Sequence, residues 1–358
     1  MDELTRIRGR IDHLDKDLLQ LLKSRYELAH QLGRIKRDRG ILIKDANRER
    51  KILSEADRIA ETERLPREQV RLIFRQVFDI AVEAQRSGNP PTTRQRLDVL
   101  IMGGTGGMGK LFARLLANQG CLVRIFGRSL ARSRRTANDL AVLPGGYGDI
   151  ARADIVMISV PISATAKVAI DAGAMMKPRS LLVDLSSVKT GIADAIARKT
   201  APLEYVSLHP LFGPDLDHIR GQRILAVPYR TRRVWPRLQR ILGHEGSHIT
   251  ITTAHAHDVM MAKIQALNHF AMMSLAASMG KTREEFDTRF WRLTKEQFRR
   301  IRRNWETVLQ IQGLNPYAAQ ERTRFKRVVD EITGMNRIDV VRISKALDTY
   351  NSGHASNK

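Results

Sequence analysis

The sequence predicts a multidomain chain with an all-α region, then an α/β region, then a second all-α region. Residues 1–86 contain no strand-like run and no glycine-rich turn, whereas short apolar runs alternate with helical segments from residue 97 to about 253. That alternation is typical of a doubly wound sheet. Helical periodicity returns from residue 254, and the polar stretch SGNPPTTRQR reads as a linker. The predicted domains are therefore 1–86, 97–253 and 254–358, with the linker at 87–96.

Composition narrows the possible partners and compartments. Lys and Arg number 61 against 38 Asp and Glu, a formal net charge of +23 that favours nucleic acid, an anionic membrane or acidic small molecules as partners. The single cysteine, Cys121, excludes a disulfide framework and a cysteine-based zinc site. No signal-peptide pattern opens the chain, and no apolar run reaches membrane-spanning length. We expect a cytoplasmic protein with no membrane partner and no metal.

The first helix carries one apolar stripe with a charged interruption. At about 1.5 Å per residue this helix is roughly 50 Å long, more than a domain of this size covers alone, so we expect it to pack against a second copy. Where the spacing requires an apolar residue, the chain has Arg25. Arg25 is either a polar residue that sets the register of a coiled coil or a desolvated cation that awaits an anion. The stripe consists of Leu4, Ile7, Ile11, Leu14, Leu18, Leu21, Leu28, Leu32 and Ile35.

Further charged and polar residues favour the anion-binding alternative. Asp45 can cap a helix whose first turns carry Arg48 and Glu49. The following helix presents Gln85 near its end, and Arg8 and Lys36 lie at the margin of the apolar stripe.

With these residues, the segment 1–86 resembles the all-helical chorismate mutases, which are intertwined dimers that hold a dicarboxylate among arginines. The resemblance implies that Arg8 reaches into the partner's pocket while Arg25, Lys36 and Arg48 line the pocket of the same chain. It also implies that Asp45 and Glu49 contact the region of the substrate hydroxyl, and that Gln85 and Lys36 contact the ether oxygen. The rearrangement of chorismate to prephenate that these enzymes catalyse needs no nucleophile. The site has only to hold the reactive conformer of the substrate and to stabilise the charge that develops on its ether oxygen.

One position departs from the mutase pattern. Ala81 stands where familiar members carry a serine that binds a substrate carboxylate, so we expect weaker substrate binding. The same residue favours an alternative in which the helical region is an inactive regulatory domain of a monofunctional prephenate or arogenate dehydrogenase.

A glycine turn follows the first of six apolar runs. In VLIMGGTGGMGKLFARLL, Gly104 permits a tight turn, Gly106 a close backbone approach to a pyrophosphate, and Gly109 close helix–strand packing. This strand–turn–helix pattern is the signature of a Rossmann dinucleotide-binding domain, and the amides at the helix start suit phosphates. The predicted cofactor contacts here are Gly104, Thr105, Gly106, Gly107, Met108 and Gly109. The six runs are VLIM (99–102), LVRIF (122–126), IVMISV (155–160), SLLVDL (180–185), ILAVPY (224–229) and HITITT (248–253).

The end of the second run decides which nucleotide is expected. An NAD site usually has Asp or Glu there for the ribose 2′-hydroxyl, but this chain has Arg128 and Ser129. A carboxylate would repel a 2′-phosphate, whereas these two residues can bind one. We expect NADP, with NAD the less favoured choice; a solvated basic helix start is the alternative explanation of the arginine.

Three further stretches follow apolar strands, where ligands of open α/β sheets bind. They are SVPISAT (Ser159–Thr165), VDLSSVKTG (Val183–Gly191) and LHPLFGPD (Leu208–Asp215). Together with AHDVMMAKIQALNHF (Ala256–Phe270), they resemble prephenate dehydrogenase. Joined to the helical segment, the whole chain resembles the bifunctional chorismate mutase/prephenate dehydrogenases of tyrosine biosynthesis. We therefore expect chorismate and prephenate as ligands, and a homodimer formed through both helical domains.

The dehydrogenase resemblance assigns roles that the residues alone would not. Taken by themselves, His209 and His269 are more often structural than catalytic; in the family pattern, His209 accepts the proton of the substrate's C4 hydroxyl. The resemblance also implies that Ser187 orients that histidine, that Gln265 and His269 form a second wall of the substrate pocket, and that Asp215 closes the mouth of that pocket. It further implies that Arg300, one of several arginines in its segment, binds a carboxylate of the substrate, and that Val160 and Pro161 contact the cofactor.

A regulator that senses NADP and binds nucleic acid is an alternative from another class, since it would explain the net charge. Against it, the basic residues are scattered and aromatic residues make up 5% of the chain, which gives little stacking surface. We therefore expect no nucleic-acid partner.

Overall fold

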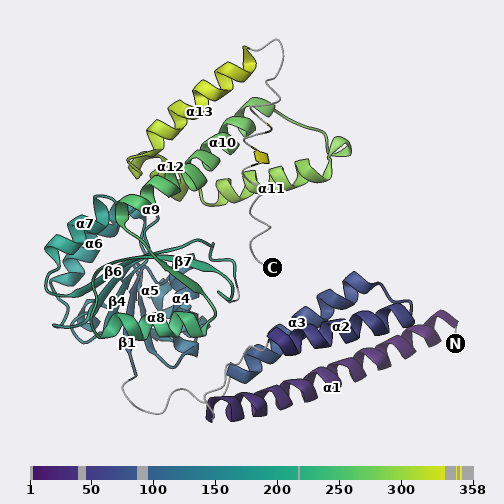
Figure 1. Ribbon diagram of the computed structural model, residues 1–358. Coiled ribbons are helices and arrows are strands. Elements are labelled where there is room, and N and C mark those ends of the chain that lie inside the picture. The colour runs from purple at the N-terminus through teal and green to yellow at the C-terminus, as the bar shows by residue number, and fades with distance from the viewer. Residues whose placement is uncertain are drawn as a thin grey trace. The chain divides into compact units, whose positions relative to one another are not determined.

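The computed structural model describes residues 3–38, 46–86, 96–216 and 218–334, with 344, 347 and 348. The chain divides into two compact units, Met1–Arg94 and Gln95–Lys358 (Figure 1). The second unit contains both the sheet and the helices that follow it, so the finer division at residue 253 stays a prediction. No helix in the described ranges is long and apolar enough to cross a membrane.

The first unit is all-helical, as predicted. It consists of α1 (Glu3–Asp38), α2 (Ala46–Thr62) and α3 (Arg67–Arg86), and α3 lies along both of the others. A Cβ at Gly33 of α1 would lie 2.1 Å from the backbone oxygen of Gln85, so glycine allows α1 and α3 to approach closely. Small residues fill the contact nearby, because Ala29, Ala81 and Ala84 are buried together.

The apolar stripe of α1 lies on the surface of this unit. Leu14 is 64% exposed and Leu21 is 71% exposed, and every other member of the stripe is also exposed. The helix period predicted from the sequence is therefore present, but α2 and α3 leave the stripe uncovered.

The second unit is built on a mixed sheet in the strand order β3-β2-β1-β4-β5-β6-β7-β8, in which only the β6–β7 pairing is antiparallel. Each of the six predicted apolar runs supplies a strand. Two strands, β3 and β6, were not among them. The strands are β1 (Asp98–Met102), β2 (Leu122–Phe126), β3 (Leu143–Pro144), β4 (Ile155–Ile158), β5 (Leu181–Asp184), β6 (Glu204–Pro210), β7 (Arg223–Arg230) and β8 (His248–Ile251).

Strand β6 escapes a hydrophobicity pattern because its buried residues include polar ones. All of Glu204–Pro210 is buried, yet the sequence is EYVSLHP. Glu204 accepts hydrogen bonds from the backbone N–H groups that begin helix α8. His209 lies within this strand, paired with Leu225 of β7.

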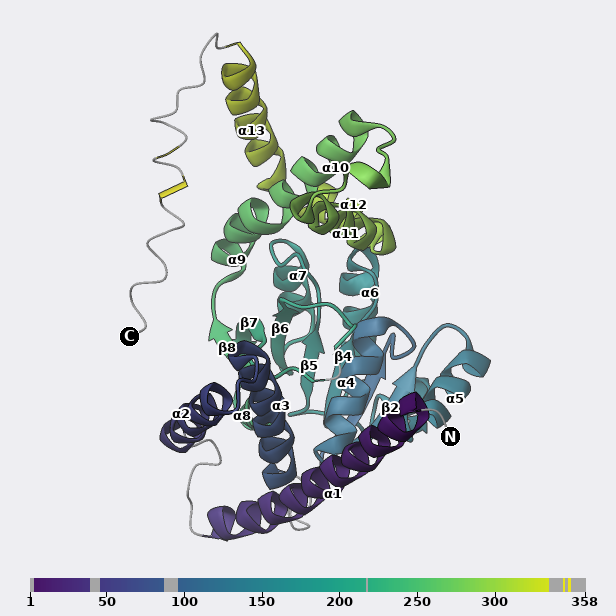
Figure 2. The same cartoon turned by 90° about the vertical axis from the view of Figure 1, so that its right-hand side faces the viewer.

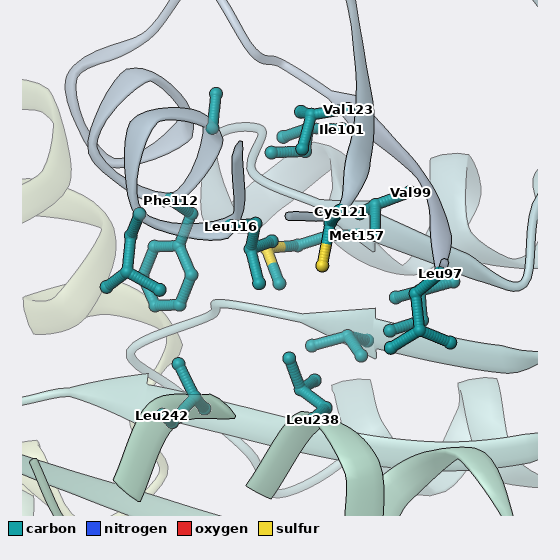
Figure 3. Close-up of a cluster of buried hydrophobic side chains, with 14 of the residues drawn as sticks. Leu97, Val99, Ile101, Phe112, Leu116, Cys121, Val123, Met157, Leu238 and Leu242 are labelled. Carbon is teal, nitrogen blue, oxygen red and sulfur yellow. The ribbon is translucent and has the colours of Figure 1, made fainter. Parts of the chain in front are cut away.

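Helices cover both faces of the sheet, and alternate strand residues enter the two cores. Ile101 and Met157 face the core under α4, α5 and α8, which Figure 3 shows around Phe112, whereas Leu100 and Val156 face the core under α6 and α7. The fold class predicted from the sequence is confirmed for this region. The covering helices are α4 (Gly107–Asn118), α5 (Leu130–Asp139), α6 (Ile162–Gly173), α7 (Ile192–Lys199) and α8 (Val234–His244).

The chain after the sheet is helical, again as predicted, and Figures 1 and 2 show α10 to α13 grouped together. Ala266 of a π-helical segment and Ile311 of α12 pack with Ile162 and Val188, which follow β4 and β5. These helices therefore contact the carboxyl ends of the central strands. The segments are α9 (Ala254–Met261), the π-helix (Ala262–Leu267), α10 (Asn268–Met279), α11 (Arg289–Arg303), α12 (Trp305–Leu314) and α13 (Ala318–Thr333), and short 3-10 turns span Tyr147–Asp149 and Glu284–Phe286.

Candidate functional site

Arg25 interrupts the stripe of α1 and turns toward α3. Its Nη1 donates a hydrogen bond to the backbone oxygen of Val77 at 3.1 Å, and its guanidinium carbon lies 5.9 Å from the centre of the Phe78 ring. The side chain is half-buried, and this burial lowers the pKa of Arg25. One hydrogen bond uses only part of the guanidinium's capacity to donate, so the group suits a carboxylate ligand.

Other predicted mutase residues lie at the same end of the α1–α3 pair. Half-buried Lys36 follows Gly33 by one helical turn, and buried Gln85 is the residue whose backbone Gly33 meets. Ala81 is buried one turn before Gln85, without a hydroxyl to offer.

The remaining predicted mutase residues lie elsewhere. Arg48 is exposed and Glu49 half-buried in the first turn of α2, while Asp45 lies outside the described residues. Arg8 is exposed and lies about 25 Å from Arg25 along α1, at 1.5 Å per residue. That separation is too large for Arg8 and Arg25 to grip one small substrate within the same chain.

The glycine turn after β1 is closely packed. The positive φ of the turn, 87°, belongs to Gly103, which the sequence interpretation left out, and not to Gly104. A Cβ at Gly104 would lie 2.5 Å from Cβ of Ile125, and one at Gly109 would lie 2.5 Å from the backbone oxygen of Gly103. The adjacent glycines in MGGTGG were the signal available for Gly103.

The start of α4 fits a dinucleotide phosphate. The helix begins after Gly106 with no side-chain cap, which leaves its first amides available to an anionic ligand. At the end of β2, Ser129 caps α5 by accepting a hydrogen bond from the Arg132 N–H at 3.3 Å. Its hydroxyl proton is not used in that bond, and exposed Arg128 precedes it.

Two contacts bring the predicted motifs to this turn. A Cβ at Gly103 would lie 2.2 Å from the backbone oxygen of Ser159 and 3.2 Å from Cγ1 of Val160, which Pro161 follows. A Cβ at Gly107 would lie 2.7 Å from Cβ of Pro214, in the LHPLFGPD stretch. The glycine turn, the SVPISAT stretch and the LHPLFGPD stretch therefore meet at one edge of the sheet.

His209 is buried at the end of β6, with 3% of its surface exposed. Its Nδ1 lies 2.9 Å from Nε2 of His257 on α9, and the two rings are tilted by 60°. Burial, with His257 and then Lys189 as neighbours, holds the pKa of His209 well below its ordinary value of 6.5. The imidazole is therefore neutral at neutral pH and able to accept a proton.

A carboxylate and a lysine complete the buried surroundings of this histidine. Asp258 accepts hydrogen bonds from the ring Nδ1 of His257 at 2.7 Å and from the backbone N–H groups of Lys189 and Thr190. Burial works to raise the pKa of Asp258, but these hydrogen bonds outweigh it and lower the pKa. The Nζ of Lys189 donates to Oγ of Ser207 at 2.6 Å and to the backbone oxygen of Leu208, and burial lowers its pKa to about 8.

Gln265 and His269 lie on the π-helix and on α10. Oε1 of Gln265 and Nδ1 of His269 are buried without a hydrogen-bond partner among the described residues, and burial lowers the pKa of His269. π-Helical turns often occur at functional sites, and unpaired buried polar atoms suit a polar ligand.

Among the described residues, three predicted ones make no hydrogen bond or ion pair with His209. Ser187 is half-buried after β5, Asp215 is exposed directly after Pro214, and Arg300 is exposed on α11. The orienting bond to His209 that the structure shows comes from His257.

The sequence interpretation missed Lys189, His257 and Asp258 although all three lie in the quoted stretches. A neighbouring His–Asp pair ahead of the IQALNHF run was the available signal. The sequence does not reveal that this pair packs on a histidine 48 positions away.

Two known protein families match different parts of the chain. Residues 7–86 match the family described as chorismate mutase type II, and residues 112–223 match the prephenate dehydrogenase nucleotide-binding domain. No group of His, Cys, Asp and Glu in the described part of the chain could hold a metal ion.

Similar solved structures share the fold of the second unit. Aquifex aeolicus prephenate dehydrogenase, solved with hydroxyphenyl propionate and NAD+, has a TM-score of 0.56 at 18% identity over 73% of this chain and 96% of its own. Synechocystis arogenate dehydrogenase has a TM-score of 0.55 at 18% identity, covering 72% of this chain and 98% of its own.

Curated relatives extend over both units. The T-protein of Enterobacter agglomerans is 30% identical over 290 residues, which cover 80% of this chain and 73% of that protein. The T-protein of Haemophilus influenzae is 29% identical over 78% of this chain and 71% of its own length. The chain therefore belongs to the T-protein family, the bifunctional enzymes that join a chorismate mutase to a prephenate dehydrogenase in tyrosine biosynthesis.

Proposed function

We propose that the two activities reside in separate sites, the mutase around Arg25 and the dehydrogenase around His209. The observation that supports the dehydrogenase site most strongly is the meeting of three elements at one sheet edge. These are the glycine turn with the uncapped start of α4, the SVPISAT stretch, and the LHPLFGPD stretch, which contains the buried His209.

In the mutase site, Arg25 holds a carboxylate of chorismate, and Arg48 and the partner's Arg8 complete the anion site. Lys36 and Gln85 stabilise the charge that develops on the ether oxygen as its bond to carbon breaks, and Asp45 and Glu49 contact the substrate hydroxyl. The half-buried environment of Arg25 supports this assignment, because a carboxylate interaction strengthens away from water.

In the dehydrogenase site, His209 accepts the proton of the C4 hydroxyl of prephenate through Nε2. Ser187 contacts the same hydroxyl, Gln265 and His269 form the opposite wall, Asp215 closes the mouth, and Arg300 binds a carboxylate. A nicotinamide held at the turn from Gly104 to Gly109 would supply the hydride acceptor for oxidation at C4, and loss of carbon dioxide would make the ring aromatic and give 4-hydroxyphenylpyruvate.

We assign NADP as the preferred nicotinamide cofactor. The turn from Gly104 to Gly109, with Val160 and Pro161, binds the part that NAD and NADP share, and Arg128 and Ser129 bind the 2′-phosphate. The free hydroxyl proton of Ser129 and the exposed guanidinium of Arg128 support this choice, since both can donate to an anion.

We further propose a cytoplasmic homodimer. The exposed stripe of α1 supports a second copy as its cover, because contiguous exposed apolar surface usually marks an interface. The one cysteine is buried and free, which agrees with a reducing compartment.

Arg25→Ala should abolish mutase turnover in a folded protein, because a substrate carboxylate loses the half-buried guanidinium that binds it. Assays with chorismate and, separately, with supplied prephenate measure the two activities. Dehydrogenation of prephenate should be unchanged, and Lys23→Ala, an exposed neighbour on α1, should leave both activities intact. Normal mutase turnover in Arg25→Ala would reject the site.

Mixing two inactive variants tests whether the mutase site is shared between protomers. Arg8→Ala and Arg25→Ala homodimers should each lack mutase activity, but a mixed dimer contains one site with both arginines. After subunit exchange, activity should return to about a quarter of wild type, since half of the dimers are mixed and each has one intact site. No recovery, with exchange verified by mass spectrometry, contradicts a shared site.

The pH dependence of the dehydrogenase tests the state of His209. A protonated imidazolium cannot accept the hydroxyl proton. The neighbouring His257 and Lys189 oppose protonation of His209, and the carboxylates of Asp258 and Asp184 lie beyond them, beside His257 and Lys189 respectively. Because the pKa lies well below 6.5, kcat/KM for prephenate should stay level as pH falls to 6.5 and decline only below it.

His209→Asn is the matched control, with kcat expected to fall by about 10²–10⁴-fold and cofactor affinity unchanged. A decline in the wild-type profile centred at or above pH 6.5 is the result that refutes the buried neutral base.

Charge reversal at Arg128 tests the cofactor. Wild-type kcat/KM should favour NADP over NAD by about 10–150-fold, the value of one charge-assisted hydrogen bond. Arg128→Asp should shift preference to NAD, because the new carboxylate repels the phosphate and accepts from the ribose hydroxyl. Gly106→Val should impair both cofactors, and Arg198→Asp on α7 should impair neither. A wild type that uses NAD as well as NADP shows the assignment to be wrong.

A further inference from the structure

Asp258, His257 and His209 form a buried chain of hydrogen bonds, the triad. Oδ1 of Asp258 lies 2.7 Å from Nδ1 of His257, and Nε2 of His257 lies 2.9 Å from Nδ1 of His209. None of the three side chains is more than 3% exposed. Nε2 of His209 is therefore the one ring nitrogen of the two histidines that the triad leaves for the substrate.

Hydrogen-bond chemistry fixes where the protons of the triad lie. An ionised carboxylate can only accept, so Nδ1 of His257 must donate to Asp258. Burial lowers the pKa of His257, and a neutral imidazole that donates through Nδ1 accepts through Nε2. Nδ1 of His209 must then donate to His257, and its own Nε2 carries a lone pair.

We propose that His257 and Asp258 are positioning residues of the dehydrogenase, which hold the proton of His209 on Nδ1 so that Nε2 always faces the substrate as a base. The inference rests on the proposed role of His209. It adds two residues that contact neither substrate nor cofactor, and it assigns them a task on a defined atom.

The carboxylate that starts the triad is itself held from several sides. It accepts from the backbone N–H of Thr190 at 2.6 Å and from that of Lys189 at 3.0 Å, while Nδ2 of Asn315 donates to the backbone oxygen of Asp258 at 3.0 Å. The backbone N–H groups of Thr190 and Lys189 favour the ionised carboxylate, and Asn315 fixes the backbone of Asp258, so the acceptor oxygen faces His257.

The nearby ammonium does not compete for the histidine. Nζ of Lys189 donates to Ser207 and to the backbone oxygen of Leu208, which precedes His209 in the strand. Lys189 thus fixes the backbone beside His209, and the ring is oriented by His257.

Asp258→Asn inverts the pattern with a minimal change of shape. The amide oxygen can still accept from Lys189 and Thr190, which turns the amide N–H toward Nδ1 of His257. That nitrogen must now accept, so His257 carries its proton on Nε2, and His209 in turn carries its proton on Nε2. A donor then faces the substrate hydroxyl, and kcat should fall by about 10²–10⁴-fold with little change in KM for the cofactor.

Two variants of His257 separate positioning from packing. His257→Phe removes the acceptor and should lower kcat about tenfold or more, whereas His257→Gln places an amide oxygen where Nε2 was and should restore most of the turnover. His255→Phe is the matched control, since His255 is exposed on the same helix and contacts Tyr317 instead. The KM for the nicotinamide cofactor of the same full-length variants reports that the dehydrogenase unit is folded and should not change.

The direct measurement is the histidine tautomer by NMR of the ¹⁵N-histidine-labelled full chain, with the His209 signal assigned by its loss in His209→Asn. The wild type should show the proton on Nδ1 of His209, and Asp258→Asn should show it on Nε2. A wild-type proton on Nε2 overturns the proposal, as does unchanged turnover of His257→Phe when His209→Asn is inactive. Near-normal turnover of His209→Asn is a different result, because it removes the base itself and with it the task of the triad.

Discussion

The buried carboxylate of Asp258 ties together three segments of the dehydrogenase unit. Asp258 lies on α9; its carboxylate binds the backbone after β5 through Lys189 and Thr190, and it binds the ring of the adjacent His257, which reaches β6 at His209. An ionised carboxylate away from water is costly unless its acceptors are satisfied. The position of His209 therefore depends on all three segments being correctly placed, and the chemistry of the site depends on the packing of α9 against the sheet.

Much of the fold follows from local patterns, because alternation and helical spacing report directly on burial. Residues such as Val99 and Leu100 alternate between the two cores as a buried parallel strand requires. β6 breaks that rule, since Glu204, Ser207 and His209 are buried for their hydrogen bonds and not for their hydrophobicity. Because polar residues interrupt its apolar ones, β6 forms no apolar run of its own, and the sequence indicated it only as the strand that LHPLFGPD follows; it is the strand that contains the proposed base.

The candidate sites were predictable to the extent that their residues lie in one stretch. The glycine turn could be located because its geometry is local, whereas the pairing of His209 with His257 arises only when α9 folds onto the sheet. Arg300 is a second case in which a local pattern does not determine tertiary placement. Its place on α11 follows from helical spacing, but spacing does not reveal which face meets a ligand, and the side chain is exposed. In the helical unit the interruption of the stripe identified Arg25, since a charge in an apolar row stands out without tertiary information.

The depth of His209 has a consequence for the catalytic cycle as a whole. With His209 as the proposed base, each oxidation would leave one proton on the imidazole, and that proton would have to leave before the next substrate reacts. At a pH near its ordinary pKa, an exposed histidine would hold this proton about half the time. Burial, which disfavours the imidazolium, makes release of the proton favourable at neutral pH, so the proposed base would return to its neutral starting state after each turnover.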